Sequence, residues 1–162
     1  MRVIKDKAVV DDNWCLLREL DSSSPIPDGN VIYPFAYWQA NRDEILKNNT
    51  THAVRIDGAI ETEALLDDLK HFSMIALDFP AFKDGRSYSH ARLLRERYDY
   101  KGELRAIGDV LRDQLFFMQR CGIDSYEVRE DKDIEDALKG LEDFTVRYQT
   151  AADGALPIYK IR

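Results

Sequence analysis

The feature that most constrains the fold is a regular alternation of short apolar segments with amphipathic segments, which begins at His52. Four apolar segments are predicted as strands, at residues 52–57, 74–79, 104–108 and 125–129. Each is followed by apolar residues at helical spacing, which predicts helices over 62–72, 87–98, 110–121 and 133–141. Strands separated by single helices run parallel, so the sequence predicts an α/β fold with a βα core over residues 52–144.

The order of these strands within the sheet is open at this stage. Strands in chain order would curl like half of an eight-stranded α/β barrel, whereas a doubled-back order would give a flavodoxin-like open sheet. Short connections and a strict βα alternation favour the sequential, half-barrel order.

The segments on either side of the core are predicted from shorter patterns. Residues 2–17 read as two β runs about a polar turn at 11–13, an N-terminal β-hairpin within an appendage of residues 1–20. Pro34 suits the first turn of a helix that runs to about Lys47. Residues 145–149 and 157–161 are candidates for one or two edge strands. A chain of 162 residues is expected to form one domain.

Composition excludes several classes of function. A net charge of −7 argues against nucleic-acid binding, which draws on a surplus of Lys and Arg. The sequence shows neither a signal-peptide pattern nor an apolar run of about 20 residues, so no membrane association and a cytoplasmic location are expected. The two cysteines, Cys15 and Cys121, are expected to be buried and reduced. No metal site and no cofactor are predicted, because zinc spacings and phosphate-binding loops are absent.

Ligands of parallel α/β sheets bind beyond the carboxyl ends of the strands. Three aspartates, Asp57, Asp78 and Asp109, occupy those positions here. They are therefore hypothesised to form a cluster of strand-end acids with a metal-binding or acid–base role. The alternative is that they order tight loops and cap helices.

A polar loop after the second predicted strand is the candidate anion site. Gly85 permits unusual backbone conformations, Ser87 or Ser89 can cap the following helix, and Arg86 offers a planar fork for an oxyanion, with His90 close in sequence. The alternative is an ordinary capped start of a helix.

Arginines continue through and beyond the second predicted helix, at Arg92, Arg95, Arg97 and Arg105. One interpretation is an electropositive docking face on an otherwise acidic protein. The other is a solvated helix face on which Arg92 pairs with Glu96.

Several stretches between Asp78 and Gly122 resemble a known bacterial family. They are DFPAFKDGRSYS at 78–89, ARLLRERY at 91–98, GELRA at 102–106, GDVLRDQL at 108–115 and RCG at 120–122. These stretches resemble the family called domain of unknown function 934. Its members tend to be encoded beside assimilatory sulfite reductase and often carry an oxidoreductase label, and the family brings no set of catalytic residues.

The resemblance implies an accessory protein of assimilatory sulfite reduction that docks on the sulfite reductase hemoprotein and aids electron delivery. An iron–sulfur cluster is unlikely on chemical grounds, because about four cysteine ligands per cluster are needed and two are present. The competing hypothesis is an enzyme or sensor that binds a small oxyanion at the strand ends. The sequence leaves open whether the protein catalyses a reaction and whether it forms a homodimer.

Overall fold

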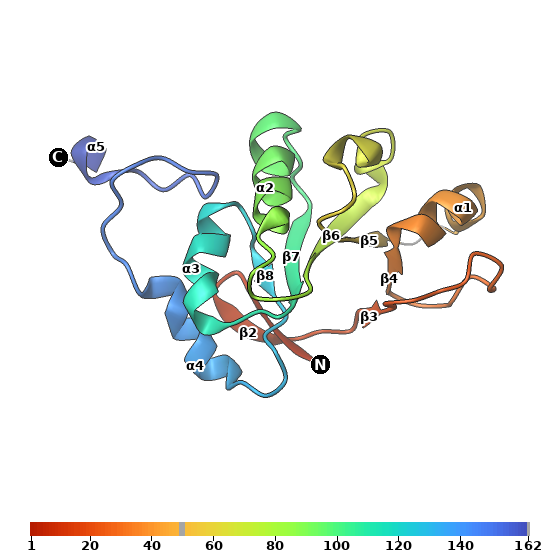
Figure 1. Ribbon diagram of the computed structural model, residues 1–162, viewed down its shortest axis with the longest axis horizontal. Helices are drawn as coiled ribbons and strands as arrows, with labels where there is room; N and C mark the ends of the chain where they lie inside the picture. Colours follow the sequence, from red (N-terminus) through yellow and green to blue (C-terminus); the bar gives the residue numbers. More distant parts are fainter. Residues whose placement is uncertain (49–50, 162) are drawn as a thin grey trace.

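The computed structural model describes residues 1–48 and 51–161, and it is built on one eight-stranded sheet (Figure 1). The strands are β1 Arg2–Lys5, β2 Ala8–Asp11, β3 Cys15–Leu16, β4 Val31–Pro34, β5 His52–Ile56, β6 Phe72–Phe79, β7 Glu103–Gly108 and β8 Ser125–Tyr126. Their order is β2-β1-β8-β7-β6-β5-β4-β3. From β3 to β8 the neighbours are parallel and follow the chain, which confirms the α/β, half-barrel prediction over the flavodoxin-like order.

The sheet has to curl, because a very short segment joins its two edges. β2 and β3 lie at opposite edges, yet β2 ends at Asp11 and β3 begins at Cys15. Four residue steps reach at most about 14 Å. In a flat sheet, seven strand spacings would separate the edges by roughly 34 Å. The residues between, Asp12 to Trp14, therefore hold the edges of a strongly curved sheet close together.

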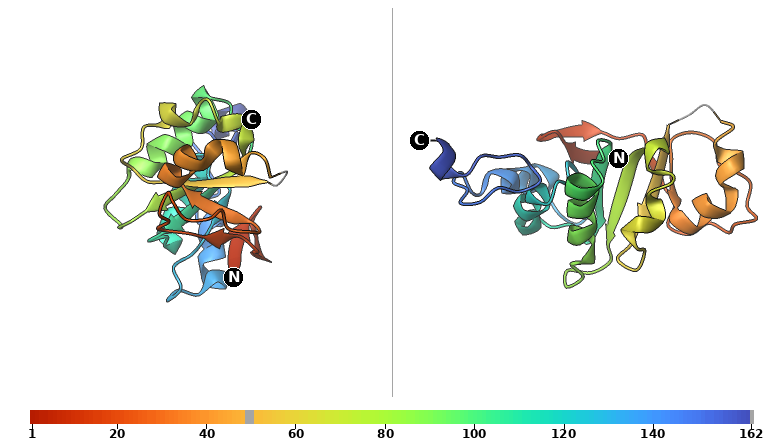
Figure 2. Two further views of the ribbon diagram at one scale, coloured as in Figure 1. Left: turned by 90° about the vertical axis from the view of Figure 1, so that its right-hand side faces the viewer. Right: turned by 90° about the horizontal axis from the view of Figure 1, so that it is seen from above.

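Helices cover one face of the sheet (Figures 1 and 2). The α-helices are α1 Phe35–Ile45, α2 Arg86–Arg92, α3 Arg112–Arg120, α4 Ile134–Lys139 and α5 Ile158–Ile161. A π-helical turn, η3 (Leu93–Arg97), continues α2, and 3-10 turns occur at η1 Thr62–Leu65, η2 Leu69–His71 and η4 Gly140–Glu142. The large core lies between these helices and the sheet, where strand residues such as Val54, Ile75 and Leu104 meet Leu94 and Leu115.

The N-terminal hairpin forms, but its turn is not at residues 11–13 as predicted. β1 and β2 pair about Asp6 and Lys7, both of which have positive φ angles, of 49° and 61°. Asp12 instead begins the segment that crosses to β3. Pro34 likewise ends β4 rather than opening a helix, and α1 starts at the next residue. Residues 31–34 thus form a parallel strand, which the sequence pattern did not predict.

The predicted helix over residues 62–72 is wrong. The chain there forms the two 3-10 turns η1 and η2. Two acidic residues, Asp67 and Asp68, fall in the second half of the segment, where the helix dipole disfavours negative charge. Asp68 is buried and accepts hydrogen bonds from Trp38 Nε1 at 2.8 Å and from Arg42 Nε at 2.5 Å. The tertiary contacts of Asp68 therefore take precedence over the local helical pattern.

The predicted edge strands in the C-terminal segment are also wrong. Residues 143–157 contain no strand, and α5 follows over Ile158–Ile161. This segment runs beside α3 instead of the sheet, and Arg120 Nη1 donates to Asp153 Oδ1 at 2.7 Å. The edge strands of the sheet are β2 and β3 instead.

We predict that Gly108→Ala destabilises the protein much more than Gly29→Ala. Both glycines have φ near +90°, at which an alanine costs about 1–2 kcal/mol. A Cβ at Gly108 would also lie 2.5 Å from the carbonyl oxygen of Phe79, whereas a Cβ at Gly29 meets nothing within 4 Å. Overpacking adds roughly 1–3 kcal/mol at Gly108. Urea denaturation of the two variants measures the difference, and equal losses would contradict the close approach of β6 and β7.

Candidate functional site

The three strand-end aspartates lie at the expected rim but have separate partners. Asp57 Oδ1 accepts the backbone N–H of Ala59 at 2.8 Å, and Asp109 Oδ1 accepts from Arg129 Nη1 at 2.7 Å. Asp78 is buried and accepts from Arg55 Nε at 2.9 Å and from Arg18 Nη1 at 3.3 Å. Within residues 1–48 and 51–161, no three His, Cys, Asp or Glu side chains are grouped to hold a metal ion.

In the candidate anion loop, the guanidinium group of Arg86 is already bound to the carboxylate of Asp84. Arg86 Nη2 donates to Asp84 Oδ2 at 2.7 Å, and Arg86 Nε donates to Asp84 Oδ1 at 3.0 Å. These bonds lower the pKa of Asp84 to about 2. Ser87 is buried, and its hydroxyl donates to the carbonyl of Asp78 at 2.7 Å. Gly85 is the residue before α2, and no side chain caps the seven-residue helix. The Arg86 guanidinium and the Ser87 hydroxyl thus already have hydrogen-bond partners within the protein. The Arg86 side chain nevertheless remains 58% exposed.

The other two residues of the candidate anion site face different surroundings. Ser89 is exposed on α2, whereas His90 is buried against the loop that carries Asp57 and Glu61. Burial lowers the pKa of His90, even though the nearby acidic groups oppose the shift. The Nδ1 atom of His90 has no hydrogen-bond partner among the described residues. Burial of His90 therefore disfavours its charged form, which argues against a role for it in holding an anion.

Two of the predicted docking arginines lie on the surface. Arg92 is 59% exposed, and its Nε donates to Glu96 Oε2 at 2.9 Å, which is the helical pairing expected from the sequence. Arg97 is exposed, and its guanidinium carbon lies 5.6 Å from the ring centre of Tyr98. Arg86, Arg92 and Arg97 are the exposed arginines of α2 and η3, and we refer to these three residues as the arginine face.

The other two arginines hold the fold together. Arg95 Nε donates to the carbonyl of Gly122 at 2.9 Å, and its Nη1 donates to the carbonyls of Tyr100 and Gly102 at 2.7 and 2.8 Å. Arg105 is only 1% exposed, so its assignment to a docking face is wrong. As the third residue of β7, it points to the face of the sheet opposite the large core, where the curvature of the sheet encloses it.

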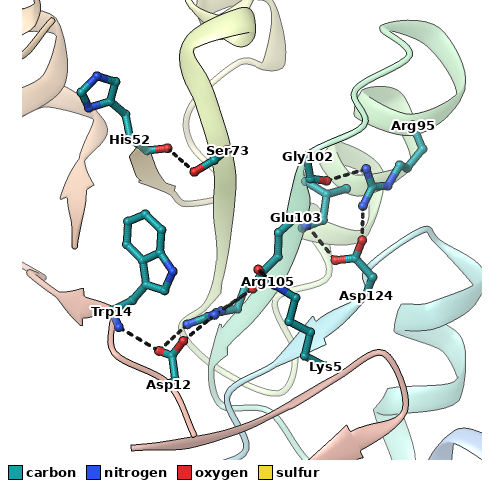
Figure 3. A network of polar contacts seen from close by, with 11 residues as sticks. Lys5, Asp12, Trp14, His52, Ser73, Arg95, Gly102, Glu103, Arg105 and Asp124 are labelled. Carbon is teal, nitrogen blue, oxygen red and sulfur yellow. Dashed lines mark hydrogen bonds and ion pairs between the residues drawn. The ribbon is translucent and has the colours of Figure 1, made fainter. Parts of the chain in front are cut away.

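That second face carries a layer of charges which sequence reasoning did not bring together (Figure 3). Arg105 binds both oxygens of Asp12, at 2.8 and 2.9 Å, and its Nε donates to Glu103 Oε1 at 2.9 Å. Lys5 Nζ donates to the other oxygen of Glu103 at 2.6 Å. The strand register aligns Arg55 with Ala76 and Ala76 with Arg105, so the arginines share one face.

A signal for this layer was available in the sequence. Charged residues recur at alternate positions of apolar strands, at Arg55, Asp78, Glu103 and Arg105. Alternate strand residues lie on one face, so the pattern predicts a charged row beside a buried sheet. Trp14 and Leu16 pack over the same face against Met74 and its neighbours.

The cysteines match the expectation only in part. Cys121 is buried, and burial raises the pKa of its thiol, whereas Cys15 is exposed at the edge strand β3. Neither forms a disulfide.

The fold and its polar groups define a half-barrel α/β protein whose inward-facing arginines, Arg55 and Arg105, form ion pairs within the chain and whose arginine face is outward. The model of the family described as "Bacterial protein of unknown function (DUF934)" matches residues 53–159, and the chain belongs to that family. No curated protein and no solved structure matches the chain. In the part of the chain that the structure describes, no helix has the length and apolar character needed to cross a bilayer.

We predict that Arg105→Leu costs about 3–5 kcal/mol of stability, because it leaves the buried Asp12 carboxylate without its cation. The matched change Arg92→Leu removes a surface pair and should cost less than about 1 kcal/mol. Chemical denaturation of both variants makes the comparison. Similar losses in the two would mean that Arg105 does not anchor the segment between β2 and β3.

We also predict that His90 makes stability depend on pH below the ordinary histidine pKa. Because the folded-state pKa of His90 is lowered, the neutral form is favoured in the fold. Its contribution is complete above about pH 6.5 and is lost as the pH falls below that value, where the unfolded chain binds more protons. The free energy of unfolding should therefore fall less between pH 8 and pH 5 in His90→Gln than in the wild type. An identical pH dependence would exclude this role.

Proposed function

We propose that this protein is an accessory protein of assimilatory sulfite reduction that docks on the sulfite reductase hemoprotein through the arginine face. Membership of the DUF934 family supports the proposal, together with the resemblance between residues 78 and 122. The observation that carries it is the exposure of Arg86 and Arg92, at 58% and 59%, beside the exposed Arg97 on a chain of net charge −7. A local arginine cluster on an acidic protein favours an acidic partner surface.

The state of the polar groups favours a docking role over catalysis at the strand ends. Asp57, Asp78 and Asp109 are bound to different partners, so they do not converge on one reacting atom. The Arg86 guanidinium is bound to the Asp84 carboxylate, and the buried Ser87 hydroxyl donates to the carbonyl of Asp78. An oxyanion at this loop would have to displace a carboxylate of the protein.

Aromatic side chains close in sequence to the arginine face add to its suitability for docking. Phe82, in the loop before α2, is 61% exposed. Tyr98, at the end of η3, donates from its hydroxyl to Glu63 Oε1 at 2.6 Å and supports Arg97. Aromatic and arginine side chains are enriched at protein interfaces. In this proposal the protein aids electron delivery by holding the reductase in a working arrangement.

We predict that the double reversal Arg86→Glu with Arg97→Glu weakens binding to the reductase about tenfold, mainly through slower association that is sensitive to salt. Surface plasmon resonance against purified sulfite reductase at two salt concentrations measures this effect.

The matched control is Arg2→Glu with Lys139→Glu, which reverses two exposed cations remote in sequence from the face. It changes the net charge equally and should retain wild-type affinity. A wild-type protein with no measurable affinity for the reductase, or a deletion strain that grows normally on sulfate as sole sulfur source, would refute the proposal.

A further inference from the structure

An aromatic groove lies between α3 and the C-terminal segment. Its volume is about 430 Å³, within the range of roughly 300–1,000 Å³ that is usual for sites of small molecules. Four aromatic side chains line it, Phe116, Phe117, Phe144 and Tyr148. Three of them, Phe117, Phe144 and Tyr148, are 56%, 62% and 79% exposed. Small-molecule sites characteristically combine aromatic and apolar sides with a few polar groups.

Contacts between aromatic rings hold the sides of the groove in place. The ring centre of Phe117 lies 5.1 Å from that of Tyr88, and the ring centre of Phe144 lies 5.0 Å from that of Phe116. Phe117 and Phe144 are thus each packed against another ring of the chain and are still more than half exposed. A ligand would meet sides that are already formed, which lowers the cost of ordering them on binding.

The charged side chains that line the groove, among the described residues, are all arginines: Arg92, Arg120 and Arg147. Arg120 is bound to Asp153, with Nη1–Oδ1 and Nη1–Oδ2 distances of 2.7 and 3.0 Å. Arg147 Nε lies 3.8 Å from Oδ2 of the same carboxylate. One carboxylate therefore faces two guanidinium groups, which leaves an excess of positive charge at the groove.

Arg147 and Arg92 are the arginines of the groove that a ligand can reach. Arg147 is 21% exposed, its guanidinium carbon lies 5.5 Å from the ring centre of Phe116, and its Nε has no hydrogen-bond partner in the described part of the chain. Arg92 is 59% exposed and donates to Glu96 through Nε. Positive charge thus lies directly beside the aromatic sides of the groove.

We infer that the groove binds a small aromatic anion, which is a flat ring system that carries a carboxylate, sulfonate or phosphate group. The ring system would pack against Phe117 and Tyr148 in the offset or edge-on arrangements that aromatic groups prefer. The anionic group would lie toward Arg147 and Arg92, where charge-assisted hydrogen bonds are available. A neutral aromatic molecule would lose the second contact, and an alkyl anion would lose the first.

The groove and the arginine face share one residue, Arg92. Arg86 and Arg97, the two residues reversed to measure docking, do not line the groove. Arg147 lines the groove and is not part of the arginine face. Variants that leave Arg92 unchanged therefore distinguish the two sites, and binding at the groove does not require the reductase. Either site can fail its own test while the other passes.

Fluorescence titration of the full chain with anilinonaphthalene sulfonate, an aromatic anion, tests the site. We expect one dye molecule per chain, with a dissociation constant near or below about 50 µM, which is reasonable for a ligand of this size. The change Phe117→Ser with Tyr148→Ser should raise that constant about tenfold, and Arg147→Gln about fivefold. The controls Phe82→Ser and Arg2→Gln remove an exposed aromatic group and an exposed arginine outside the groove, and they should leave the affinity unchanged.

A conservative variant and three competitors separate charge from shape. Arg147→Lys keeps the positive charge and should stay within about threefold of the wild-type affinity. Naphthoate should displace the dye, whereas the neutral naphthol and the alkyl anion decanoate should need concentrations at least about tenfold higher.

Five results would overturn the inference. They are the absence of dye binding, an unchanged affinity in either groove variant, a loss in either control, an equal loss in Arg147→Lys and Arg147→Gln, and displacement by naphthol or decanoate as effective as that by naphthoate.

Discussion

The short segment from Asp12 to Trp14 is the constraint on which the rest of the structure depends. It joins opposite edges of an eight-stranded sheet, so the sheet must curl enough to bring those edges within the reach of a few residues. Curvature in turn creates an enclosed second face, where Trp14 and Leu16 pack against strand side chains. The bidentate pair between Asp12 and Arg105 fixes the segment to the middle of the sheet.

The same curvature divides the arginines of the chain between interior and surface. Arg105 and Arg55 point into the enclosed face, where acidic groups neutralise them. Arg86 and Arg97 lie beyond the sheet, on α2 and η3, and stay exposed. Sequence spacing alone places Arg86, Arg97 and Arg105 in one basic stretch. Because Arg105 lies on the enclosed face of the sheet, only part of that stretch is available to a partner.

The parts of the fold that sequence could predict are those with strong local patterns. The apolar segments that became β5, β6 and β7 were found nearly to the residue, because each is bounded by polar turns. β4 was missed, since a four-residue run that ends in proline carries no strand period. β3 lies within the second predicted run of residues 2–17, but it pairs in parallel with β4 and does not form the hairpin. The roles of Asp68 and Arg105 depend on partners 26 and 93 positions away, and no local pattern reports such contacts. In the candidate site, the Arg92–Glu96 pair was predictable because the two residues are four positions apart on one helix. The pairing of Arg105 was not predictable, because its partner Asp12 is 93 positions away.

The pairing of β1 with β8 sets the order in which the molecule can be completed during its synthesis. Ile4 is opposite Tyr126 in the sheet, so the first strands wait for most of the chain to leave the ribosome before they find their place. The early βα segments can assemble meanwhile, with one flank of the sheet uncovered. When the amino-terminal hairpin pairs with β8, β1 covers that flank of the sheet and the short strand β2 becomes the edge.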